Sequence, residues 1–167
     1  MGFKNLEHLP QEYALESVYG SGTGALLIAM EQVVHIAKNG VDYALVFPRT
    51  LPTENGLRFP THDNDGLQVG FFERDKGYEV PPHRHLPRKI DLEHIAEFIA
   101  IEKGRVAITV YDEEWNVVGE QEVKTGECII FLRGGHALQM LEPTRIMEVK
   151  QGPYPGKSND KILKDAS

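Results

Sequence analysis

The chain has 167 residues, the length of one domain with a single substantial core. Its 41% hydrophobic and 26% charged residues are ordinary for a soluble globular protein, and its net charge of −7, without any run of lysine or arginine, argues against a nucleic-acid partner. No apolar run approaches the roughly 20 residues that span a bilayer, and the N-terminus has no signal-peptide core, so we expect no membrane association and a cytoplasmic location.

The first part of the chain predicts few regular elements. A weak apolar pattern before residue 20 is compatible with a short helix or a strand. Strands are expected around 24–35 and 42–48, with a hairpin turn at Lys38-Asn39-Gly40 between them. Prolines and Asn-Gly and Asp-Gly turns then exclude a helix up to residue 66.

From residue 67 onward, short predicted strands alternate with turns at a regular spacing. Residues 105–111 are rich in β-branched side chains, and Glu113-Glu114-Trp115-Asn116 is a plausible hairpin loop. This rhythm predicts an antiparallel all-β jelly roll or sandwich, not a helical bundle or an alternating α/β fold. The expected strands span residues 67–72, 78–85, 94–102, 105–111, 116–123, 128–132, 136–141 and 145–151.

Four side chains are candidate metal ligands. His83 and His85 are one residue apart, so in a strand their imidazoles would face the same side. Glu97 opens an apolar segment that reads as a buried strand ending in a turn at Gly104, and His136 follows a Gly-Gly turn at the start of another expected strand. Three imidazoles and one carboxylate suit a divalent Fe, Mn, Ni, Co or Zn ion and suit Ca or Mg poorly.

These residues carry a resemblance to the cupin superfamily. The run from Gly77 through His83-x-His85 to Glu97 and Gly104 resembles the first cupin motif. The stretch from Gly126 to His136 resembles the second.

The chain departs from the family pattern in three places. Eleven residues separate His85 from Glu97, where three or four are usual in the family. Leu132 replaces a common proline, and His136 comes one residue early, with Met140 in place of a common asparagine. Asp91 and Glu93 also lie in the long spacer, but we prefer Glu97 as the ligand because six residues separate it from Gly104 and its flank is apolar.

The resemblance implies a fold and a site. The fold is a double-stranded β-helix, a closed jelly-roll barrel, over residues 66–167, with residues 1–65 as an extension of strands or a short helix within one structural domain. The ending from Glu148 to Tyr154 resembles small single-domain cupins associated with sugar-nucleotide and surface-polysaccharide genes. The implied metal ligands are His83, His85, Glu97 and His136, and the candidate catalytic residues at the rim of the cavity are Gln151 and Tyr154.

The expected function follows from this site. We expect a small metal-binding cupin that acts on a small polar metabolite such as a carbohydrate derivative. Its activity would be that of a metal-dependent isomerase, epimerase or dioxygenase. Two alternatives stay open. One is a non-catalytic metal-bearing module that binds a small ligand, and the other is a metal-free epimerase or isomerase in which a histidine is the base and a tyrosine the acid. A homodimer formed by strand exchange or edge pairing is also expected.

Overall fold

The computed structural model describes residues 32–53 and 56–164, and these residues form an all-β protein with antiparallel sheets, which confirms the predicted class. The elements predicted before residue 32 lie outside the described residues. Within the described residues the elements are β1 (Val34–Lys38), β2 (Val41–Phe47), β3 (Leu57–Arg58), β4 (Phe71–Phe72), β5 (Glu97–Lys103), β6 (Arg105–Tyr111), β7 (Val117–Lys124), β8 (Cys128–Phe131), β9 (Gly135–Met140), β10 (Arg145–Lys150) and the short helix α2 (Lys157–Asp160).

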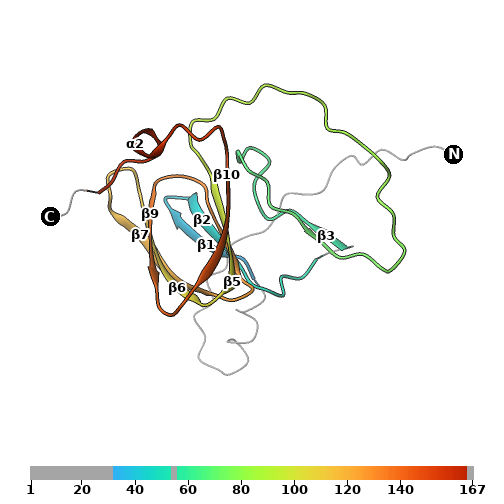
Figure 1. Ribbon diagram of the computed structural model, residues 1–167, viewed down its shortest axis with the longest axis horizontal. Coiled ribbons are helices and arrows are strands. Elements are labelled where there is room, and N and C mark those ends of the chain that lie inside the picture. Colours follow the sequence, from blue (N-terminus) through green and yellow to red (C-terminus); the bar gives the residue numbers. More distant parts are fainter. Residues whose placement is uncertain (1–31, 54–55, 165–167) are drawn as a thin grey trace.

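Two sheets pack face to face. The larger has the strand order β1-β2-β8-β5-β10 and the smaller the order β7-β6-β9, while β3 and β4 form a separate pair (Figure 1). Every ladder is antiparallel. This arrangement is compatible with a β-sandwich. Strands β1 and β2, which come from the predicted N-terminal extension, continue the larger sheet beyond β8.

The main core lies between the two sheets. On β6, Val106, Ile108 and Val110 are buried while the residues between them are more exposed, which is the period of two expected for a strand with one buried face. Ile99 and Ile101 of β5 enter the same core from the larger sheet. Apolar burial on facing strands therefore holds the sheets together.

A second core covers the outer face of the larger sheet. Leu45 and Phe47 of β2 and Ile130 of β8 pack there against Leu51 and Leu132. Strand β2 is thus buried on both faces, which explains why the sequence Tyr-Ala-Leu-Val-Phe is continuously apolar instead of alternating.

Two predicted turns are confirmed. Asn39 and Gly40 join β1 to β2 with φ values of 53° and 76°, the positive values that a tight two-residue hairpin turn needs and that Asn-Gly adopts readily. Gly104 joins β5 to β6 with a φ of 98°, and an added Cβ there would lie 2.5 Å from Thr144 Oγ1. The first turn sets the register of β1 against β2, and the second leads the chain from the larger sheet to the smaller one.

The predicted strand at 78–85 is wrong. Residues 73–96 form no strand and run away from the two sheets as an extended segment, which we call the arm (Figure 1). The predicted strand at 67–72 is reduced to β4. Pro81, Pro82 and Pro87 explain why the strand predicted at 78–85 does not form, because proline cannot donate to a strand ladder.

In the described part of the chain, no helix is long and apolar enough to cross a membrane.

Candidate functional site

Glu97 and His136 meet at one end of the main core. Glu97 is the first residue of β5 and lies on the same strand face as the buried Ile99. His136 of β9 lies opposite the buried Val110 of β6. Because alternate residues of a strand face the same side, both side chains point between the sheets. Glu97 Oε2 is 3.5 Å from His136 Nε2, so two of the predicted ligands, 39 positions apart in the sequence, are neighbours.

An aromatic ring holds the imidazole in place. Phe131, the last residue of β8, stacks on His136 with ring centroids 3.9 Å apart and an interplanar angle of 12°. Phe131 is also the register partner of Glu97 across β5 and β8. The stack restricts the histidine ring and covers one of its faces, so the ring can meet a ligand only through its other face and its edge.

Charged residues of β10 and α2 surround this pair. Lys150 of β10 is the register partner of Glu97, and Glu148 lies two residues earlier on the same face of the strand. Lys150 Nζ is 3.8 Å from Glu148 Oε1 and 2.8 Å from Asp160 Oδ2. The lysine therefore joins the sheet to α2 beside the partly buried Glu97 and His136.

Burial disfavours the charged forms of both Glu97 and His136. Burial, together with a hydrogen bond and charge repulsion from Glu148, raises the pKa of Glu97 to about 7, although Lys150 and Lys161 oppose the shift. Burial lowers the pKa of His136, and the positive charge of Lys161 acts in the same direction. Near neutral pH the site thus combines a carboxyl group that is partly protonated with a neutral imidazole.

The pair opens into a cleft of about 1060 Å³. Its walls come from the end of the arm, the β6–β7 turn, the β8–β9 turn, the start of β9, and the C-terminal segment that begins in α2. The lining residues on which the arguments below depend are Glu97, Trp115, Arg133, His136, Lys150 and Lys161. The volume suits a small metabolite.

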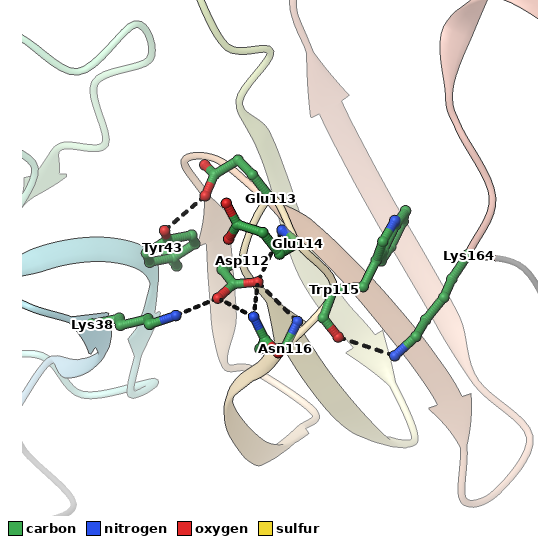
Figure 2. Close-up of polar contacts among 8 residues, drawn as sticks. All are labelled: Lys38, Tyr43, Asp112, Glu113, Glu114, Trp115, Asn116 and Lys164. Atoms are coloured by element: carbon green, nitrogen blue, oxygen red, sulfur yellow. Dashed lines mark hydrogen bonds and ion pairs between the residues drawn. The ribbon is translucent and has the colours of Figure 1, made fainter.

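A buried carboxylate shapes the β6–β7 wall of the cleft (Figure 2). Asp112 Oδ1 accepts hydrogen bonds from the backbone amides of Glu114 at 3.0 Å and Asn116 at 2.8 Å, and the Lys38 ammonium donates to Oδ2. These bonds hold Trp115 in the left-handed conformation, with a φ of 65°, which is uncommon for a bulky residue. The turn thereby presents the indole of Trp115 to the cleft.

His83 and His85 lie on the exposed arm, away from Glu97 and His136. Their ring centroids are 5.5 Å apart, and His83 Nδ1 is 2.9 Å from the Pro81 carbonyl oxygen. Among residues 32–53 and 56–164, no three His, Cys, Asp or Glu side chains are grouped closely enough to hold a metal ion. In this structure the predicted set is thus divided into two pairs.

Gln151 and Tyr154 lie outside the described lining of the cleft. Gln151 Oε1 accepts a hydrogen bond from the Ala96 backbone amide at 2.8 Å, and its Nε2 donates to the Gly66 carbonyl oxygen at 3.2 Å. The Gln151 side chain therefore links Ala96, the last residue of the arm, to Gly66, which precedes the arm in the sequence. Tyr154 is 62% exposed, with the Lys150 ammonium 5.6 Å from its ring centroid.

Sequence reasoning missed several residues of the site. Glu148 could have been predicted from the sequence, because Glu148 and Lys150 are two residues apart, on one face of a strand whose other residues are mostly apolar. No sequence pattern indicates Arg133, Lys161 or Trp115, since only the folded chain brings their segments to the cleft.

No protein-family model, no curated protein and no solved structure matches the chain. The resemblance to cupins therefore depends only on the residues of the two motifs and of the ending from Glu148 to Tyr154.

Proposed function

We propose that the protein is a small cupin-like protein that binds a divalent transition metal and a small polar metabolite in the cleft beside Glu97 and His136. The observation that carries the proposal is the 3.5 Å separation of Glu97 Oε2 and His136 Nε2. Each residue was selected from a different sequence motif, and their proximity is what a shared site requires.

The geometry of this pair suits two adjacent positions around one ion. Ligand atoms about 2.1 Å from a tetrahedral or octahedral ion lie about 3.0 to 3.4 Å apart. The observed separation is close to that range, so a small side-chain rotation would let both groups bind. A bound divalent ion would polarise a carbonyl or hydroxyl group of the metabolite as a Lewis acid.

The arm would supply the two remaining ligands. Eleven residues separate His85 from Glu97, and an extended chain spans about 3.3 to 3.6 Å per residue, so this linker can reach about 40 Å. Strand β9 lies at the edge of its sheet, and one side of its backbone has no strand partner among the described residues. An arm that folded over this open edge, without joining the ladder, would bring His83 and His85 toward His136.

Metal analysis tests this proposal. Protein purified without chelator should contain a first-row divalent ion, and stripped protein should rebind nickel or zinc in calorimetry. Glu97→Gln and His136→Asn should each weaken binding at least about tenfold, as should His83→Asn combined with His85→Asn. His62→Asn is the matched control, because that histidine is exposed and lies beside Asp42 instead. Wild-type protein that binds none of these ions would refute the proposal, and a ligand recovered unchanged with metal bound would favour the non-catalytic binding module.

A second candidate function is metal-free proton transfer, as in an epimerase or isomerase. The pKa of about 7 at Glu97 and the lowered pKa of His136 favour it, because one group can donate a proton while the other accepts one at neutral pH. His136 would remove a proton from carbon next to a carbonyl group, and protonated Glu97 would donate one to the carbonyl oxygen.

Deuterium exchange tests this second function. Metal-stripped protein in D₂O should exchange the α-hydrogen of small ketoses or keto acids, as followed by NMR, and His136→Asn should abolish the exchange. Exchange that requires added metal, or that survives His136→Asn, would argue against it.

A further inference from the structure

The cleft carries four cationic side chains, two of which are held by neighbours. Lys150 pairs with Asp160 at 2.8 Å. Lys164 Nζ donates to the Trp115 carbonyl oxygen at 3.0 Å (Figure 2) and lies 4.6 Å from the Tyr111 ring centroid. Arg133 and Lys161 form no ion pair within residues 32–53 and 56–164.

The inner acidic groups of the cleft are already engaged. Asp112 binds Lys38 and Asn116, and the Tyr43 hydroxyl donates to Glu113 Oε2 at 2.8 Å. The hydrogen bond from Tyr43 lowers the pKa of Glu113 and the positive charge of Arg133 helps to lower it, but the Glu113 and Arg133 side chains form no ion pair in the described part of the chain. Asp112 is thus neutralised by Lys38, whereas Glu113 keeps its negative charge because its donor is a neutral hydroxyl, and neither carboxylate forms an ion pair with Arg133 or Lys161 among the described residues.

Arg133 is placed as a binding group would be. It lies in the β8–β9 turn, three residues before His136, and it lines the cleft. Its Nε is buried and has no hydrogen-bond partner among the described residues. A buried N–H group without a partner costs free energy, and the planar donor fork of a guanidinium can bind two oxygens of a carboxylate or phosphate at once.

Lys161 reaches the cleft on a segment attached at both ends. The Asp160 contact with Lys150 fixes the residue before it, and the Lys164 contact with Trp115 fixes the chain three residues later. Lys161 itself is exposed and lines the cleft. Lys161 therefore belongs to the C-terminal wall of the cleft.

We infer that the metabolite bound in this cleft carries a carboxylate or phosphate group, which Arg133 and Lys161 hold next to Glu97 and His136. The inference deepens the proposed function, because it assigns the chemical class of the ligand to the same cleft. An anionic group between these two cations would place the rest of a small ligand against the carboxyl and imidazole pair.

The single tryptophan of the chain provides a direct measurement. Trp115 is half-buried and lines the cleft, so a ligand there should change its fluorescence. Metal-stripped protein would be titrated with inorganic phosphate, malonate and neutral glucose at constant ionic strength. Phosphate and malonate distinguish the two anion classes. We expect a saturable change with at least one of them and none with glucose.

Variants locate the response. Arg133→Gln and Lys161→Gln should each weaken anion binding at least about tenfold, the loss expected for one charge-assisted hydrogen bond. Lys103→Gln is the control, because Lys103 is an exposed lysine at the other end of β5. Circular dichroism would show that each variant is folded.

Two results would overturn the inference: no saturable response to either anion, or binding that both cleft variants leave unchanged. Because these titrations contain no metal, they fail or succeed independently of the metal analysis above. Anion binding without metal binding would leave the ligand class intact and refute only the metal centre.

Discussion

The Lys38 ammonium contacts the carboxylate of Asp112, which lies 74 positions later in the sequence and is 2% exposed. This contact joins the β1–β2 hairpin to the β6–β7 turn, and so ties the larger sheet to the wall of the cleft. The lysine and the Asn116 hydrogen bonds hold the pKa of Asp112 well below its usual range.

Acid should therefore destabilise the protein through Asp112. A carboxyl group with a depressed folded-state pKa contributes stability at pH values above its unfolded pKa of about 3.9, and this contribution is lost as the pH falls toward the folded value. Urea unfolding at pH 6 and pH 3 should show a smaller loss for Asp112→Asn than for wild type. Glu114→Gln serves as a control, since only its backbone amide contacts Asp112. Equal losses in Asp112→Asn and wild type would contradict this role.

Glu97 should give the opposite dependence on pH. Its folded-state pKa is raised to about 7, so the folded protein holds this proton more tightly than the unfolded chain does. Stability should fall as the pH rises from about 4.5 to about 7 and then level off, by an amount on the order of 2 kcal/mol. Subtracting the profile of Glu97→Gln from that of wild type isolates this contribution. A flat difference would show that Glu97 titrates normally.

The arm should become ordered when metal binds. Coordination by His83 and His85 would hold the arm against the cleft and so protect backbone amides of residues 78–86 from hydrogen exchange. Mass spectrometry with and without nickel measures this protection, and the His83→Asn, His85→Asn double variant should abolish it. Protection that persists in the double variant would mean that the arm responds to something other than these histidines.

Gln151 should act through structure. Its side chain bonds the Ala96 amide and the Gly66 carbonyl, so Gln151→Ala should lower the free energy of unfolding by about 1 to 2 kcal/mol. Gln139→Ala is the control, because that glutamine lies on the exposed face of β9. If the Gln151 variant kept full stability but lost deuterium exchange, the residue would instead be catalytic.

Local patterns were sufficient for several strands and turns. The alternating β-branched segment at 105–111 is β6 with the same bounds, because its period of two matches a sheet with one buried face. Asn39-Gly40 predicts the first hairpin because those residues tolerate positive φ. The two histidines of the arm fit a period of two and so predict a strand, but the neighbouring prolines cannot complete a ladder.

The candidate site divides in the same way. The motifs identified Glu97 and His136, and their proximity follows from the packing of the two sheets, because β5 and β9 belong to different sheets. The expected homodimer stays a prediction, which light scattering in solution would check.

The order of apolar and polar residues in this protein determined the sheets, the tight turns and two members of the candidate site, since these depend on neighbours along the chain. Only the tertiary structure decided that Arg133, Lys161 and Trp115 line the cleft, and that burial moves the pKa of Glu97 to about 7. Those properties depend on distances and on the exclusion of water between segments far apart in sequence, and no local pattern records either.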